Sequence, residues 1–170
     1  MTPKNESMKL YKSKKLLNID NNAKTIKGQK YKYMTAILYL APQRTSGFNV
    51  CPMASAGCMA SCLNTAGRGQ MNSVQQGRIN KTKWYFLERK TFLDQLRIEI
   101  KRHILRCKKN GFKPAIRLNG TSDIDWNIHN LYNEFPKVKF YDYTKIYKRA
   151  LKYVKKEYPK NYHLTYSLNE

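Results

Sequence analysis

The sequence lacks the features of a membrane or secreted protein. None of its apolar runs approaches the roughly 20 residues that span a bilayer, and its mean hydropathy is −0.72. The N-terminus is polar and Lys-rich, without the apolar segment of a secretory signal. We therefore expect no membrane partner and a cytoplasmic location, where thiols stay reduced and structural disulfides are rare.

Acidic residues are also scarce. The 170 residues include 33 Lys and Arg against 11 Asp and Glu, a formal net charge of +22. Such a chain attracts polyanions. It has no RNP-type segment, no paired zinc-finger spacing and no heptad repeat, so no recognised nucleic-acid motif accompanies the charge. A nucleic acid or other polyanion as partner and a merely Lys-rich surface both stay open.

Internal repeats and low-complexity tracts are absent, and the length fits one domain with a single core. Residues 1–32 are basic, with only Glu6 and Asp20 as acids. They predict a flexible arm with a short hairpin near Lys27 and Gly28. Residues 33–170 then form a single α/β domain.

Strand and helix patterns alternate along this domain. Strands are predicted at residues 33–41, 115–118, 138–143 and 163–167. Helices are predicted at residues 72–88, 91–110, 126–134 and 145–158, with Asn72 or Ser73 capping the first and Thr91 the second. This alternation predicts a parallel sheet with right-handed crossovers, as an incomplete (half) barrel or an open sheet.

The last predicted helix is amphipathic. We expect its apolar stripe to be buried and its basic stripe to face solvent. The apolar stripe comprises Tyr147, Leu151, Val154 and Tyr158.

Polar residues gather just after the predicted strands. In parallel α/β folds the carboxyl ends of the strands form one rim, where ligands bind. We therefore expect a ligand site at this rim. Its candidate residues are Arg68, Asn119, Ser122, Asp123, Tyr143 and Lys145. Arg68 and Lys145 suit a carboxylate or phosphate, whereas Asp123 either orients a ligand or caps the following helix.

The loop after the first strand holds Cys51, Cys58 and Cys62 in the spacing C-x6-C-x3-C. Small residues around these thiols let the loop wrap closely around a bulky group. Three thiolates suit a [4Fe–4S] cluster that keeps one iron open for another ligand. The alternative is a structural zinc site, although zinc sites usually use shorter C-x2–4-C knuckles.

The remaining cysteine and the histidines are weaker candidates. Cys107 lies on the apolar face of its predicted helix, which favours a core cysteine over a fourth ligand. His103, His129 and His163 are isolated in the sequence, so we expect ordinary surface or core positions for them.

Several segments resemble the phage "gene product 88" family. They are ILYLAPQRTSGFNVCPMASAGCMASCLNTAGRG at residues 37–69, QGRINKT at 76–82, IRLNGTSDIDW at 116–126 and YDYTK at 141–145. The resemblance covers residues 24–170 and implies a phage protein of unknown function in the host cytoplasm. It implies that the cysteine loop ligates the cluster, with Arg68, Arg78, Asn119, Ser122, Asp123, Tyr143 and Lys145 around it.

The layout is also similar to that of radical S-adenosylmethionine enzymes, which implies S-adenosylmethionine as a further cofactor and an electron donor as a partner. The spacing differs from the C-x3-C-x2-C of those enzymes, and Asn119-Gly120-Thr121 stands where they carry Gly-Gly-Glu. Three functions thus remain open, and the sequence decides neither between them nor whether the chain is an enzyme. They are a cluster-binding protein with an open iron, a nucleic-acid-binding protein with a structural or redox-sensing cluster, and a small zinc module.

Overall fold

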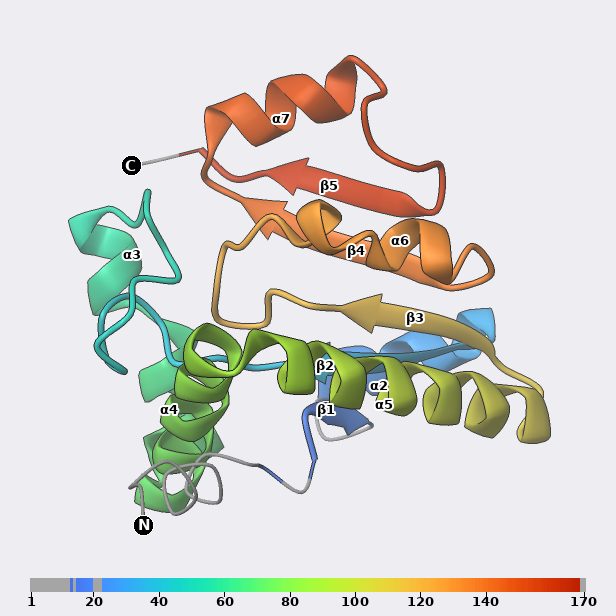
Figure 1. The fold of residues 1–170 in the computed structure, drawn as a ribbon, viewed down its shortest axis with the longest axis horizontal. Helices are drawn as coiled ribbons and strands as arrows, with labels where there is room; N and C mark the ends of the chain where they lie inside the picture. Colours follow the sequence, from blue (N-terminus) through green and yellow to red (C-terminus); the bar gives the residue numbers. More distant parts are fainter. Residues whose placement is uncertain (1–12, 14, 20–22, 169–170) are drawn as a thin grey trace, which may run out of the picture.

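The computed structural model describes residues 13, 15–19 and 23–168. The described chain is an α/β fold on an open five-stranded sheet in the order β1-β2-β3-β4-β5 (Figure 1). The strands are β1 (Leu17–Ile19), β2 (Tyr33–Leu38), β3 (Lys113–Arg117), β4 (Lys139–Thr144) and β5 (Tyr162–Tyr166). Strands β2 to β5 run parallel, and β1 is antiparallel to β2. The predicted α/β class with parallel βα units is confirmed, and the sheet is open.

Helices connect the parallel strands. Between β2 and β3 lie α3 (Ala56–Ala60), two short 3-10 turns η2 (Leu63–Thr65) and η3 (Gly67–Gln70), α4 (Asn72–Leu87) and α5 (Arg89–Lys109). Between β3 and β4 lie η4 (Trp126–His129) and α6 (Leu131–Glu134), and α7 (Tyr147–Val154) joins β4 to β5. The elements α2 (Ala23–Ile26) and η1 (Lys27–Tyr31) precede β2. Figure 1 shows α5 and α6 in front of the sheet.

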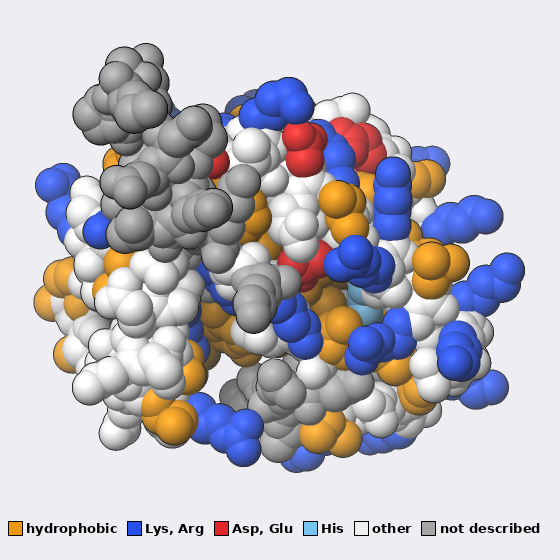
Figure 2. Space-filling model, turned by 60° about the horizontal axis from the view of Figure 1, so that its bottom comes forward, with side chains coloured by type: hydrophobic (Ala, Val, Ile, Leu, Met, Phe, Trp, Pro, Cys, Tyr) orange, Lys and Arg blue, Asp and Glu red, His pale blue; other side chains and the backbone are white. Residues whose placement is uncertain are grey.

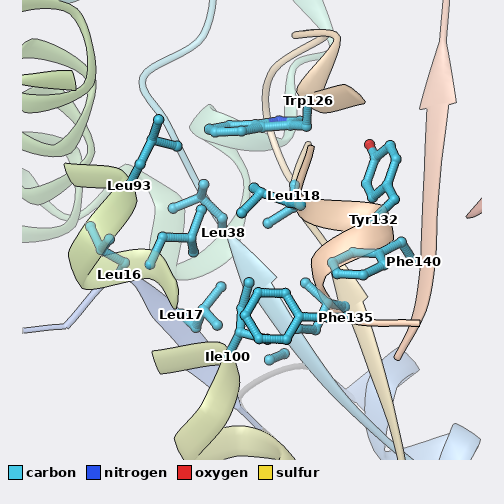
Figure 3. Close-up of a cluster of buried hydrophobic side chains, with 14 of the residues drawn as sticks. Leu16, Leu17, Leu38, Leu93, Ile100, Leu118, Trp126, Tyr132, Phe135 and Phe140 are labelled. Carbon is cyan, nitrogen blue, oxygen red and sulfur yellow. The ribbon is translucent and has the colours of Figure 1, made fainter. Parts of the chain in front are cut away.

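The two faces of the sheet differ because side chains alternate along each strand. Even-numbered residues such as Leu38, Ile116 and Phe140 face the helices and form the core with α5 side chains such as Ile100 (Figure 3). Odd-numbered residues such as Tyr143 point to the opposite face.

Part of the predicted flexible arm belongs to the fold. Leu16 and Leu17 are almost fully buried in the core. The Glu99 carboxylate of α5 accepts hydrogen bonds from their two backbone N–H groups at 2.8 Å each, and Lys81 Nζ of α4 donates to the Leu16 carbonyl at 3.0 Å. These residues of the predicted arm are therefore packed into the fold. The rest of the first half of the arm lies largely outside the described residues.

The expected hairpin near Lys27 and Gly28 is instead the turn η1, which ends at Lys32 in a left-handed conformation with φ 60°. Lys27 and Gly28 both lie within this turn.

The long helices lie close to where the sequence predicts them, but their starts differ. Met71 occupies the N-cap position of α4 without a side-chain hydrogen bond, so neither Asn72 nor Ser73 is the cap. Helix α5 begins at Arg89, directly after α4. Thr91 consequently lies inside its first turn, where the hydroxyl donates to the Glu88 carbonyl. The predicted helix at 126–134 is divided by Asn130, whose φ is 58°.

Helix α7 buries a different side from the one expected, although Tyr158 of the predicted apolar stripe, beyond the end of the helix, is buried. Arg149 is buried, whereas Tyr147 and Val154 of the predicted apolar stripe are 60% and 75% exposed. The Arg149 guanidinium reaches under the helix to Asp123 and to the Tyr162 hydroxyl. This buried ion pair sets the rotation of the helix, which an amphipathicity pattern does not record.

The surface of the described chain is strongly basic, and Figure 2 shows Lys and Arg side chains spread over one side with few acidic ones among them. Its helices are all too short or too polar to cross a membrane.

A candidate site at the carboxyl ends of the strands

A cavity of about 230 Å³ lies at the carboxyl ends of β2 to β5. Cys51, Cys58 and Cys62 line one side of it, and residues 119–123 and 143–145 line the other. The structure thus brings the cysteine loop and five of the six predicted ligand residues into one place. The order of the parallel strands causes this, because their carboxyl ends share one edge of the sheet.

Short local contacts shape the cysteine loop. The Ser55 hydroxyl caps α3 by accepting from Cys58 N at 3.1 Å. The Val50 carbonyl accepts from Asp123 N at 2.7 Å, which ties the loop to the segment after β3. Cys51 Sγ lies 3.6 Å from the Thr121 carbonyl. The three thiols are free and only partly exposed.

The thiols also interact electrostatically. Burial raises the pKa of Cys51 to about 11; a hydrogen bond with the Gln43 backbone opposes this, and negative charge at Cys62, Asp123 and Cys58 adds to it. The cavity therefore disfavours an isolated thiolate at Cys51. A bound cation reverses that balance, since metal coordination deprotonates a thiol.

Within the described residues, no group of three His, Cys, Asp or Glu side chains could hold a metal ion. Cys107 belongs to no such group; it is buried in α5 with its Sγ 3.6 Å from His103 Nε2. Its predicted core position is confirmed. His129 contacts the Tyr85 hydroxyl at 2.9 Å, and His163 lies on β5 away from the cysteines.

Asn119 organises the segment after β3. Its Oδ1 accepts three hydrogen bonds, and its Nδ2 donates to the Ile124 carbonyl and to Asp142. The three donors to Oδ1 are Ser122 Oγ, Ile124 N and Trp126 Nε1. Since both amide hydrogens and the oxygen are already used, we no longer expect the Asn119 or Ser122 side chain to be a principal ligand contact.

Asp123 links the same segment to α7. One carboxylate oxygen accepts from Thr144 Oγ1 at 3.0 Å and from Lys145 N at 2.9 Å, and the other accepts from Arg149. Asp123 is therefore neither a free ligand group nor the cap of the following helix. That cap is Asp125, whose side chain accepts from Asn127 N.

Basic and aromatic side chains lie opposite the cysteines. Lys145 lines the cavity while its Nζ donates to the Leu168 carbonyl at 2.9 Å. The Arg117 guanidinium lies 5.0 Å from the ring centre of Tyr143, which is 48% exposed. Sequence reasoning missed Arg117, although its place at the end of a predicted strand was a usable signal.

The two other predicted arginines lie apart from this wall. Arg68 is exposed in η3 and does not line the cavity. Arg78 of α4 donates to Asn64 Oδ1, and its Nε–H is buried without a partner. Burial lowers the pKa of Arg78, and negative charge at Tyr39 and Cys62 opposes this shift. Arg78 therefore holds Asn64, two residues after Cys62, and is not a free ligand group.

Gly120 lies where two parts of the site meet most closely. A Cβ on this residue would lie 2.7 Å from the Leu38 carbonyl and 2.6 Å from Tyr39 Cδ1. Only glycine lets the segment after β3 approach β2 this closely.

Comparison with known proteins gives one match. The family model described as Gene product 88 matches residues 10–170. No curated protein and no solved structure gives a significant match.

Proposed function

This chain belongs to the Gene product 88 family of phage proteins, and we propose that it binds a [4Fe–4S] cluster through Cys51, Cys58 and Cys62. The observation that carries the proposal is that three free thiols from one loop line the same cavity. Such thiols in a reducing cytoplasm more often serve metal binding than disulfide formation. We place this activity in the cytoplasm of the infected cell.

The sequence spacing C-x6-C-x3-C fits the short C-x2–4-C knuckles of structural zinc sites poorly, which supports the cluster. A tetrahedral zinc site holds thiolate sulfurs only about 3.8 Å apart, because each Zn–S bond is about 2.3 Å. In a [4Fe–4S] cluster each thiolate ligates a different iron, so the sulfurs lie farther apart.

The opposite wall suits an anionic ligand. A cluster held by three thiolates would supply one iron with an open coordination position and a one-electron couple. Lys145 and Arg117 would hold a carboxylate or phosphate beside it. S-adenosylmethionine carries a carboxylate and fits this chemistry, in which case an external electron donor is a required partner.

The test is the spectrum and metal content of the full chain purified without oxygen. We expect a brown protein with broad absorption near roughly 400 nm and about four iron and four sulfide per chain. Cys58→Ala removes a ligand, so iron and sulfide should fall sharply. Cys107→Ala is the matched control, because that cysteine lies in the core, and its cluster content should stay at the wild-type level.

Two results would overturn the proposal. A colourless protein with one zinc per chain would identify a structural zinc module. Equal iron loss in Cys58→Ala and Cys107→Ala would show that the iron is not held by the loop thiols. If the cluster is found, a change in its spectrum on addition of S-adenosylmethionine then tests whether the open iron binds this ligand.

A further inference from the structure

The sheet has a second face, which meets the proposed cluster site only at Arg117 and Tyr143. Odd-numbered side chains of β2 to β5 point away from the α5 side of the sheet. A second cavity of about 490 Å³ lies on this face, between η1 and the amino-terminal halves of the strands. We call this surface the open face. Its defining residues are Tyr33, Arg117, Lys139, Tyr141, Tyr143 and His163.

Aromatic rings and cations alternate on the open face. Lys113 Nζ lies 5.8 Å from the Tyr33 ring centre, and Arg117 lies 5.0 Å from that of Tyr143. Lys139, Tyr143 and His163 are exposed. An exposed tyrosine ring beside a guanidinium offers a ligand both an apolar stacking surface and a cation.

The charge of the open face is of one sign. No acidic residue lines its cavity, and Asp123 is the only acidic residue among those lining the adjoining cysteine cavity. The Asp123 carboxylate is already paired with Arg149. A chain with a net charge of +22 therefore presents here a surface of tyrosines and cations with no competing free carboxylate.

We propose that the open face binds single-stranded nucleic acid, with bases stacked on Tyr141 and Tyr143 and phosphates on Lys139 and Arg117. Base stacking on aromatic rings combined with a basic groove is the general chemistry of such sites. The open face continues into the cysteine cavity through Arg117 and Tyr143. A bound strand can thus extend towards the thiols, although its binding does not depend on the cluster.

The spacing of the rings selects a single strand over a duplex. Tyr141 and Tyr143 point to the same face of β4, and two residues along a strand span about 6.6 Å. Stacked bases in a duplex rise only about 3.4 Å per nucleotide. Bases placed on both rings must therefore be unstacked and extended, which a paired duplex does not allow.

The test is fluorescence anisotropy of the full chain with labelled oligothymidylate and oligouridylate of about 15 nucleotides, the upper range of such sites. A duplex of equal length is measured beside them. We expect Tyr143→Ala to weaken single-strand binding at least about fivefold, the lower end for loss of one stacked base. We expect Lys139→Gln to reduce the slope of log affinity against log salt by about 0.7.

Two exposed residues of α7 provide matched controls. Tyr147→Ala removes a ring that is 60% exposed, against 48% for Tyr143, and Lys148→Gln removes one exposed charge, both outside the open face. Tyr147→Ala should change the affinity less than Tyr143→Ala does, and Lys148→Gln should change the salt slope less than Lys139→Gln does. Preference for oligouridylate or oligothymidylate distinguishes RNA from DNA as the natural strand.

Several results would overturn this inference. They are no binding of either oligonucleotide, equal effects of Tyr143→Ala and Tyr147→Ala, or equal affinity for the duplex with equal sensitivity to Tyr143→Ala. Equal effects of the two tyrosine variants would show that the Tyr143 ring makes no specific contact. Equal binding of the duplex would show that the open face does not select unpaired bases. Because the readout is anisotropy, it stays separate from the iron and sulfide content that tests the cluster.

Discussion

Asp142 is a fully buried carboxyl group on the core side of β4, and it holds the segment that forms the site. It accepts from Asn119 N at 2.9 Å and from Asn119 Nδ2 at 3.2 Å. Burial raises its pKa from 3.8 to about 7, against the opposing effect of the Asn119 hydrogen bond and of Arg117 and Arg149. The rim of the cavity therefore rests on a group that titrates near neutral pH.

This shift predicts a pH-dependent stability. Between about pH 4 and pH 7 the native state binds a proton at Asp142 that the unfolded state does not, so the stabilisation from Asp142 is greatest at low pH and is lost as the pH rises to about 7. We expect the wild-type free energy of unfolding, taken relative to that of Asp142→Asn, to fall over this range by a few kcal/mol, at most about 4. Urea denaturation of both proteins from pH 4.5 to 7.5 measures it.

His129 acts in the opposite sense, because burial lowers its pKa and neutral imidazole is favoured in the fold. It is present in both proteins, so its effect cancels in the difference. A difference that stays constant over this pH range would contradict the assignment to Asp142.

The residues that line the cavity were predictable from the sequence only where they follow the end of a predicted strand. The positions after the strands identified Asp123, Tyr143 and Lys145, and all three line the cavity. What each does there was not predictable, because the carboxylate of Asp123 is used by Arg149, 26 residues away in the chain. Long-range pairs of this kind leave no local pattern.

At the scale of elements, β1 shows how a short segment in a basic stretch of the sequence gains a place in the core. Glu99 and Lys81, from two different helices, bind the backbone of Leu16 and Leu17 at the start of β1, and both leucine side chains are buried in the core. Burial lowers the pKa of Lys81 to about 8, with Glu99 opposing. The short strand therefore depends on tertiary contacts rather than on its own propensity.

Truncation of a β1 side chain tests this dependence. Leu17 is 1% exposed, so Leu17→Ala should leave a cavity and lower the free energy of unfolding by about 2–5 kcal/mol. Leu105→Ala is the control, because that side chain is 67% exposed on α5, and it should change stability by less than about 0.5 kcal/mol. Thermal and urea unfolding measure both. Equal, small effects would place β1 outside the cooperative unit.

The elements from β2 onward were predictable because their hydrophobic periods are strong. The α5 stripe of Leu93, Leu96 and Ile100 has helical spacing and is buried as expected. Helix α7 has an equally clear stripe, yet it buries Arg149, which pairs with Asp123, and leaves Tyr147 and Val154 of that stripe exposed. Periodicity therefore predicts the existence of a helix more reliably than the face that the helix buries.

At the scale of the whole molecule, excess positive charge is the dominant property. Ion pairs within the described chain include those of Lys90, Arg97 and Arg149, and the whole sequence has 33 Lys and Arg against 11 Asp and Glu. Pairing each acid with one cation would still leave 22 cations without an acidic partner. The composition alone revealed this imbalance, whereas only the structure places part of it on an open sheet face.

This imbalance predicts that salt stabilises the protein. Added salt screens repulsion between exposed charges over a Debye length of about 10 Å at 0.1 M, and self-repulsion weakens the compact state. Raising sodium chloride from about 0.02 to 0.3 M should increase stability by about 1 kcal/mol, or the unfolding midpoint by roughly 2–4 °C. Differential scanning fluorimetry measures this, and a midpoint that falls would contradict it. Oligonucleotide affinity should weaken over the same range. Binding releases counterions from the nucleic acid, and this release is less favourable at higher salt concentration. The two opposite salt responses separate repulsion within the chain from attraction to a polyanion.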